Sequence, residues 1–330
     1  MRYLDITTEA AGDQADQLEA VMSREAAIRR IVALHAPGLR AEIREKRALR
    51  YGTEPGSASG IASHVRAASA IRRQGSRLIV IQDDVNALAV IDASSCIMPL
   101  LLPPGADGRR SFDDTIGNKH LKMDLEAAVV LPDARVLAFG SGSARARERI
   151  VIVESETGVR VRRAPGLYAR LRKHCEAVVT GGRSGSLVFD VDLAQFLRWL
   201  AGRGPVPNVI DVLEVDLGSI DGVPFGFTDA AVAVDGRIAF VACAEESVNV
   251  RGDGPVLGCR FGWLDDTGAQ VTDVIESDGR ATPLKLEGIE PRPGSIRVFD
   301  VVADMDRPDH PALLAELWVT GWPDSSLTGL

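Results

Sequence analysis

The feature of this sequence that most constrains its fold is a short phrase that recurs along the chain. Residues 126–138 read EAAVVLPDARVLA and align without a gap with residues 68–80, ASAIRRQGSRLIV. Looser copies begin at Glu176, Asp229 and Glu287, so that successive copies start about 50–60 residues apart. Each copy holds a small or acidic residue, an apolar run, a turn with Gly or Asp, and a second apolar run. This order is typical of a β-hairpin.

Additional strands are expected between the copies, and they define the predicted fold class. Apolar or alternating runs occur at residues 87–92, 149–155, 209–217 and 313–319. Three or four strands in a repeat of this length match a blade of a β-propeller. We therefore predict an all-β propeller of five blades, with a sixth blade from residues 40–60 and the C-terminus as an alternative. A β-sandwich, or a pair of them, is the competing fold, but it does not require the same phrase in every repeat.

Two segments outside the repeats have helical patterns. Residues 12–35 carry a patchy apolar stripe, so we predict an N-terminal helical extension over residues 1–50 and a propeller domain over residues 51–330. The segment 192–202, DLAQFLRWLAG, has Asp192 as a candidate N-cap and Gly202 at its end. We expect this second helix to lie over the edge of a blade.

Composition argues against several classes of function. The net charge is −8, from 38 basic and 46 acidic residues, which opposes general attraction to nucleic-acid phosphates. No apolar run reaches the roughly 18 residues of a membrane helix. The first residues also lack the apolar core of a secretory signal. Nucleic acid and membrane are therefore not expected as partners, and a cytoplasmic location is predicted.

The four cysteines give no sign of a zinc site. Cys96, Cys175, Cys243 and Cys259 form no C-x-x-C pair and have no metal-ligand spacing with the five histidines. Cys243 lies in the apolar stretch IAFVACA, where a free thiol behaves as a small hydrophobic residue.

The acidic residues that open four of the copies, here called anchors, are the predicted metal ligands. On a propeller the anchors would begin the innermost strands and point into the central channel: Glu126, Glu176, Asp229 and Glu287. Carboxylates that share a channel repel each other and lose hydration, so a positive group must compensate them. A hard cation such as Ca²⁺, neighbouring basic side chains, or water could do so. The other readings are that the acids only line a water-filled channel, or that they act directly in catalysis.

Further charged residues are candidates for a ligand site at the channel mouth. Basic residues flank the copy that begins at residue 126, and acids follow the second strands of several hairpins. Acids in such places also form ordinary exposed turns. If they share a face with the anchors, they surround the channel mouth. The predicted ligand-binding residues are Lys119, Lys122, Asp83, Asp84, Arg145, Arg149, Glu245, Asp304 and Asp306.

Two classes of function follow from this pattern. In the first, the propeller binds a small ligand, a cation or a protein at the channel mouth without catalysis. In the second, it is a metal-dependent hydrolase of phosphate or carboxylic esters whose channel carboxylates hold the cation. The chain has no G-x-S-x-G, H-E-x-x-H or G-x-x-x-x-G-K-[ST] motif. The absence of a visible activated nucleophile favours the first class.

A family resemblance adds to this reading. The phrases DLEAAVVLPDARVLAFGSGS and KLEGI resemble the D-L-E-G-I/L signature of the phytase-esterase-like bacterial propellers. The span of about residues 57–320 is similar to an uncharacterised bacterial propeller family. The resemblance implies a calcium-tolerant propeller with phosphoesterase or esterase ancestry. The chain departs from the signature at Ala127, in place of a glycine, and at Lys285, in place of an aspartate. The matching residues are Asp124, Leu125 and Glu126 in one repeat and Leu286, Glu287 and Gly288 in another.

Overall fold

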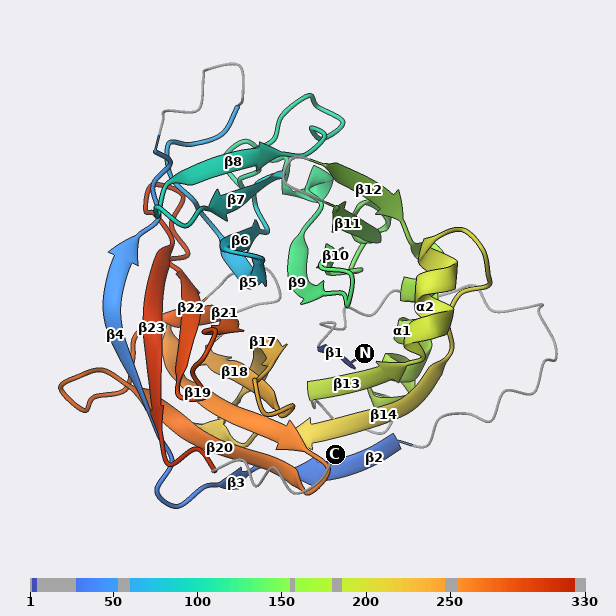
Figure 1. Cartoon of the computed structure of the whole chain (residues 1–330). Coiled ribbons are helices and arrows are strands. Elements are labelled where there is room, and N and C mark those ends of the chain that lie inside the picture. Colours follow the sequence, from blue (N-terminus) through green and yellow to red (C-terminus); the bar gives the residue numbers. More distant parts are fainter. Residues whose placement is uncertain are drawn as a thin grey trace.

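The computed structural model describes residues 2–4, 28–52, 60–154, 158–179, 186–246 and 254–323. Strands dominate these residues, and their sheets stand around a common centre as the blades of a β-propeller do (Figure 1). The prediction of an all-β propeller is confirmed. In the described part of the chain, no helix combines the length and the apolar character needed to cross a membrane.

Two of the sheets are meanders of consecutive strands. In each, the first strand lies nearest the centre and the last lies outside (Figure 1). The first sheet contains β5 (Ala68–Gln74), β6 (Arg77–Gln82), β7 (Ala87–Ile91) and β8 (Ile97–Leu101). The second contains β9 (Leu125–Val130), β10 (Val136–Gly140), β11 (Arg149–Val153) and β12 (Val159–Arg163).

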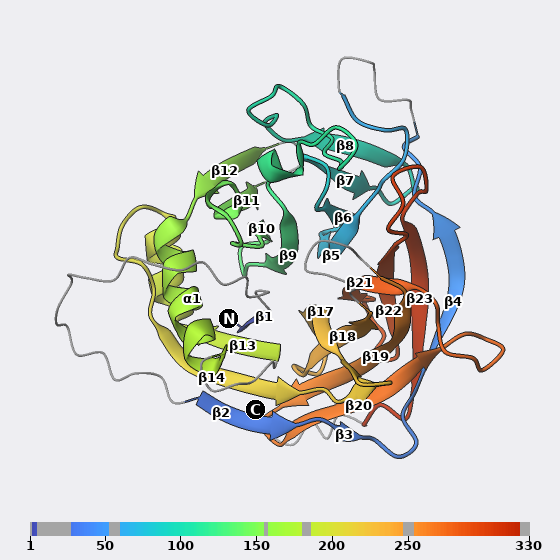
Figure 2. The ribbon, with the colours of Figure 1, turned by 180° about the vertical axis from the view of Figure 1, so that it is seen from behind.

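A third sheet is built from distant segments of the chain. Its order is β1-β13-β14-β2, and β2 pairs parallel with β14. The helices α1 and α2 pack between this sheet and its β9–β12 neighbour, at the periphery of the ring (Figures 1 and 2). The elements are β1 (Arg2–Leu4), β13 (Ser186–Val191), β14 (Val209–Asp216), β2 (Ile28–Val32), α1 (Pro165–Val179) and α2 (Leu193–Leu200).

The remaining large sheet has two halves. One half contains β17 (Gly226–Val232), β18 (Ile238–Glu245), β19 (Val256–Asp265) and β20 (Gly268–Ile275). The other contains β21 (Lys285–Pro291), β22 (Val298–Asp304), β23 (Leu313–Thr320) and β4 (Arg40–Ala48). A short parallel pairing of β20 with β4 joins the halves, and β3 (Leu34–His35) also pairs with β20. The small hairpin of β15 (Ser219–Ile220) and β16 (Val223–Pro224) precedes β17.

The predicted N-terminal helical extension is wrong over residues 28–48. These residues form β2, β3 and β4, which pair with the outer strands of sheets formed later in the chain. In β4, Ala41 and Ile43 are buried and alternate with more exposed residues, as on a strand with one covered face. The apolar stripe fitted a helix because the distant partner strands are not visible in the local sequence. The rest of the predicted helix, residues 12–27, lies outside the described residues.

The hairpin predicted to begin at Glu176 is also wrong. Residues up to 179 belong to α1, and Glu176 is exposed on its surface. The helix buries Leu167, Tyr168, Leu171 and Cys175, which lie one above another on a helical face. The residues predicted to form the turn, 180–185, lie outside the described residues.

The predicted second helix is confirmed as α2. The Asp192 carboxylate accepts a hydrogen bond of 2.7 Å from the Gln195 main-chain N–H, which satisfies one free donor of the first turn. Phe196, Trp199 and Leu200 are buried against the neighbouring sheet.

Cys243 is not the free thiol that its apolar surroundings suggested. Cys243 in β18 lies directly opposite Cys259 in β19, and the two form a disulfide. Both residues are buried, so Cys243 is nevertheless part of the apolar core. Disulfides persist mainly in oxidising compartments, which weighs against the prediction of a cytoplasmic location.

A β-bulge recurs near the start of four strands that face the centre. In β5, β9, β17 and β21 one residue is skipped in the pairing with the next strand. The skipped residues are Ser69, Glu126, Thr228 and Glu287. A shift of one residue along a strand moves a side chain to the opposite face. The structural equivalent of Glu126 is therefore Thr228, and not Asp229 as the sequence alignment predicted.

Candidate functional site

Lys122 is the centre of a charged cluster at one end of the channel, here called the channel mouth. Its Nζ lies 3.0 Å from Asp83 Oδ2, 2.8 Å from Asp84 Oδ1 and 2.6 Å from Asp124 Oδ1. Lys122 precedes β9, whereas Asp83 and Asp84 follow β6, so the ammonium bridges two sheets. Lys122 is only 7% exposed, and its three partners compensate the cost of burying its charge.

Further donors contact two of the same acids, Asp124 and Asp84. Ser141 Oγ donates a hydrogen bond of 2.5 Å to Asp124 Oδ2, and an Arg147 guanidinium nitrogen lies 2.9 Å from the same oxygen. Lys119 Nζ is 3.6 Å from Asp84 Oδ2 and 3.1 Å from Asp114 Oδ2. Asp124 itself has a positive φ of 56°, a conformation that Asp tolerates better than most residues. Asp124 is thus held by donors on both of its oxygens.

Lys285 organises a second charged group, at the start of β21. Its Nζ lies 3.2 Å from Glu245 Oε2, 3.5 Å from Glu287 Oε1 and 3.2 Å from Asp306 Oδ1. This position is the Lys285 that replaces the aspartate of the D-L-E-G signature. The replacement supplies a cation for acids that come from three different strand ends.

Burial and repulsion raise the pKa of several carboxyl groups at the mouth. Burial raises the pKa of Glu287 to about 8, and the charges of Asp304 and Asp306 add to this effect while Lys285 opposes it. Burial also raises the pKa of Glu126 well above its usual value, and the nearby charges of Asp83 and Asp124 raise it further. The charge of Glu287 also raises the pKa of Glu126, so the two carboxylates repel each other.

The residues of the mouth fit a hard cation only in part. Ligand oxygens of Asp83, Asp124 and Glu126 lie within 4.8 Å of one another, and oxygen is the donor that Ca²⁺ takes. Asp83 Oδ1 is buried without a hydrogen-bond partner in the structure. Asp124, in contrast, already receives Lys122 on one oxygen and Ser141 on the other. The donors that suit a cation are therefore Asp83 Oδ1 and Glu126, with Lys122 as a competitor for the same charge.

A polar cavity of about 250 Å³ adjoins the cluster. Its lining includes Asp84 and Lys119 from the cluster, together with Arg66 and Arg307. Asp304 and Asp306 also line it, on the side of β22. The cavity is just below the usual size range of drug-sized ligand sites, so it suits a small polar molecule.

Two of the four anchors lie at the mouth and two do not. Glu126 and Glu287 are there, whereas Glu176 is on the surface of α1. Asp229 is deeper in the channel, where its carboxylate forms two contacts of 2.6 and 2.7 Å with the Arg72 guanidinium and accepts a hydrogen bond from the Ile289 main-chain N–H. The prediction of Glu176 and Asp229 as metal ligands is therefore wrong, since one is remote and the other is fully paired.

Most of the predicted ligand-binding residues meet at the mouth, but two arginines do not contact the acids. Arg145 is exposed, and Arg149 Nε donates to the Ala146 carbonyl oxygen. Arg147, between them, reaches Asp124. The predicted ligand-binding residues included neither Arg147 nor Ser141, because alternate residues of one short loop point in different directions. The GSGS stretch at 140–143, which follows a strand, was the available signal.

Comparisons with known proteins place the chain in a family without defining its activity. A family model described as "Family of unknown function (DUF6929)" matches residues 64–319. No curated protein matches the sequence. None of these findings names a phytase-like propeller, so that resemblance rests on the phrases around Glu126 and Glu287 alone.

Several solved structures resemble the chain only distantly. A streptogramin B lyase has 9% sequence identity and a TM-score of 0.36, covering 85% of this chain and 98% of the other. A putative gluconolactonase has 10% identity and a TM-score of 0.35, covering 88% and 96%. The calcium-binding protein regucalcin of Agrobacterium tumefaciens has 12% identity and a TM-score of 0.35, covering 91% and 99%. Similarity at this level carries no argument about function.

Proposed function

Since the chain belongs to DUF6929, a family of unknown function, we propose its function from the geometry of the channel mouth. The protein is a five-bladed propeller that binds a divalent cation at this mouth, and Ca²⁺ is the ion that its oxygen donors suit best. The sheets support five blades, because β5, β9, β1, β17 and β21 each begin a set of four strands.

One observation carries the proposal. Asp83 Oδ1 is buried and unpaired beside Glu126, although almost every buried polar atom in a folded protein has a partner. A cation between these two carboxylates would satisfy Asp83 Oδ1 and relieve the repulsion that raises the pKa of Glu126. A small polar molecule, held by Lys119 and Arg66 in the adjoining cavity, would be the second ligand of the site. A protein partner at the mouth is the other proposed occupant.

We expect the purified protein to bind about one Ca²⁺ per chain. At a free Ca²⁺ concentration about 100 times its Kd, the ion should stabilise the fold by about 2.7 kcal/mol. Glu126→Gln keeps the size of the side chain but removes its charge, and should weaken Ca²⁺ binding by about ten-fold or more. Calcium titration calorimetry and thermal melts measure both effects.

Asp278→Asn is the matched control for this experiment. Asp278 lies in an exposed turn, where it pairs with Arg280, so its loss should leave calcium binding unchanged. If Glu126→Gln and the parent bind calcium with equal affinity, Glu126 is not a ligand of the ion. A parent that binds no Ca²⁺ at millimolar concentration would leave Lys122 as the cation of the mouth and refute the proposal.

Metal-dependent ester hydrolysis is the second candidate, and the raised pKa of Glu287 favours it. A carboxyl group with a pKa of about 8 can accept or donate a proton near neutral pH, as a general base or acid must. A bound cation would supply polarisation of the ester and activation of water. If this function holds, calcium-dependent hydrolysis of p-nitrophenyl phosphate or acetate should be lost in Glu287→Gln. Hydrolysis that persists in this variant, or that ignores calcium, would come from another source.

A further inference from the structure

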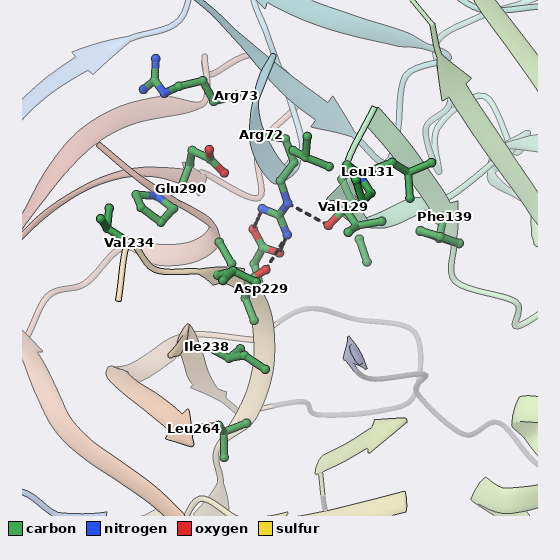
Figure 3. A pocket seen from close by; sticks show the side chains of 18 of the residues that line it. Arg72, Arg73, Val129, Leu131, Phe139, Asp229, Val234, Ile238, Leu264 and Glu290 are labelled. Carbon is green, nitrogen blue, oxygen red and sulfur yellow. Dashed lines mark hydrogen bonds and ion pairs between the residues drawn. The ribbon is translucent and has the colours of Figure 1, made fainter. Parts of the chain in front are cut away.

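A second and larger cavity, of about 650 Å³, opens at the opposite end of the channel (Figure 3). Its lining includes the second halves of the inner strands β5, β9, β17 and β21, whereas the channel mouth is formed where these strands begin. The walls are largely apolar, and include Val129, Leu131, Phe139, Val188, Ile238 and Leu264. A cavity of this size and character lies within the range of small-molecule binding sites.

The rim of this cavity is unusually apolar for a protein surface. Val232 and Val234, at the turn between β17 and β18, are 68% and 63% exposed. Val130, at the end of β9, is 37% exposed on the same rim. An apolar molecule in the cavity would cover part of these side chains and so gain hydrophobic free energy.

The ion pair of Arg72 and Asp229 separates this cavity from the channel mouth. Arg72 donates to Asp229, to the Ala128 and Ala230 carbonyl oxygens and to Ile289 O, and so spans β5, β9, β17 and β21. Figure 3 shows this pair among the side chains that line the cavity. Because each partner satisfies the other, neither is available as a counter-ion for a ligand.

Among the described residues near the cavity, one acid forms no ion pair. Arg73 and Arg292 both pair with Asp300, at 2.7 Å each. Glu290 lies beside the Arg72–Asp229 pair and is only 9% exposed (Figure 3). The main-chain N–H of Arg73 stabilises its carboxylate, but in the described residues no side chain forms an ion pair with it. The cavity therefore combines an apolar body with one buried carboxyl group.

We propose that this cavity binds a small apolar molecule that carries a protonated amino group, with the ammonium opposite Glu290. The ammonium would supply the missing counter-charge and hydrogen-bond donors, while the apolar body fills the cavity. An anionic ligand would instead meet both Glu290 and Asp229. The available arginines could not compensate it, because acids already occupy them. This site is separate from the proposed calcium site.

The proposal predicts how the affinity for the amine changes with pH. Burial raises the pKa of Glu290 to about 7, with the positive charges of Arg72 and Arg73 opposing the shift and Asp229 adding to it. The other charged side chains that line the cavity are held in ion pairs: Arg72, Arg73, Asp229 and Arg292. An alkylamine stays protonated up to about pH 10, so ionisation of Glu290 controls its binding. Amine affinity should rise about ten-fold from pH 6 to pH 8.

Isothermal titration of the full chain with three matched probes tests the proposal. At pH 8, 4-phenylbutylamine should bind about ten-fold or more tightly than 4-phenylbutanol, and 4-phenylbutyrate should bind most weakly. Glu290→Gln should remove the preference for the amine and leave the alcohol affinity unchanged. Ala231→Phe, which adds a ring to a residue of the cavity wall, should weaken binding of amine and alcohol alike.

Glu214→Gln is the control variant, because Glu214 is a similarly buried acid on β14 that pairs with Arg30 and does not line the cavity. It should bind the amine as the parent does. The proposal is overturned if amine and alcohol bind the parent equally, if the carboxylate binds best, or if none of the probes binds at millimolar concentration. Unchanged amine binding in Glu290→Gln would overturn it as well. Each of these outcomes is independent of calcium binding at the mouth.

Discussion

Replacing Arg72 with methionine is expected to lower the free energy of unfolding by about 3–5 kcal/mol, because it leaves Asp229 buried without its cation. The two side chains are 4% and 2% exposed, so water cannot replace the lost contacts. The Ala128, Ala230 and Ile289 carbonyl oxygens would lose a donor at the same time. Urea melts at pH 7 measure the difference.

Arg73→Met is the matched control for this prediction. Arg73 is the next residue of β5, and its partner Asp300 keeps Arg292 as a second cation. The control should therefore lose much less stability than Arg72→Met. The double variant Arg72→Met, Asp229→Asn should lose less than the sum of the two single variants, since no charge is then left alone. If both arginine variants lose the same free energy of unfolding, the Arg72–Asp229 pair contributes no more to stability than the contacts of Arg73.

Lys122→Met is expected to destabilise the protein by about 3–5 kcal/mol at pH 7, since one ammonium compensates three carboxylates. The Lys122 side chain is 9% exposed, so solvent screens these contacts little. Lys119→Met is the control, because the Lys119 side chain is 35% exposed and surface pairs contribute about 0–1 kcal/mol. Urea melts of both variants and the parent make the comparison.

The pH dependence of Lys122→Met has a defined sign. Burial lowers the pKa of Lys122, but the charges of Asp83, Asp124 and Asp84 together raise it above its usual value. In the variant these acids lose their cation, so their ionised forms are destabilised at neutral pH. Burial raises the pKa of Asp83 to about 7, an effect that Lys122 opposes and that Asp84 and Asp124 increase. Lowering the pH from 7 toward 5 therefore protonates Asp83 and should narrow the gap in stability between variant and parent. Added Ca²⁺ at pH 7 should restore part of the loss. A gap that stays constant with pH would mean that the loss comes from packing instead.

The sequence predicted the hairpins well because their determinants are local. In the turn between β9 and β10, Asp133 Oδ1 accepts a hydrogen bond from the Arg135 main-chain N–H, a contact between residues two positions apart. The apolar runs on both sides supply strands with buried faces. Such signals are complete within a dozen residues, so a single sequence contains them.

The bulges explain why only some of the anchors lie at the channel mouth. Glu126 and Glu287 occupy bulges and reach the mouth, whereas Asp229 is one position beyond the bulge of β17. A bulge adds one residue without a clear change in composition, so the alignment of apolar runs could not place it. The alignment therefore assigned Asp229 to the wrong face of its strand.

The charge partners in the channel could not be predicted, because they are remote in sequence. Arg72 and Asp229 come from opposite parts of the chain, and neither has a local feature that marks it as buried. Lys122 was chosen as a counter-charge because it precedes Glu126, yet its contacts are with Asp83, Asp84 and Asp124. The sequence predicted a positive charge at this position, but which acids Lys122 contacts depends on how the neighbouring sheets pack.

The pairing of β4 with β23 has a consequence for folding during synthesis. Residues 40–48 leave the ribosome long before residues 313–320, with which they pair. At typical elongation rates β4 must wait on the order of 15–50 s for its partner. An unpaired strand can join other chains during this time, and charged residues discourage such aggregation. Four charged residues of β4 are exposed in the folded protein and would discourage aggregation of the unpaired strand: Arg44, Glu45, Lys46 and Arg47.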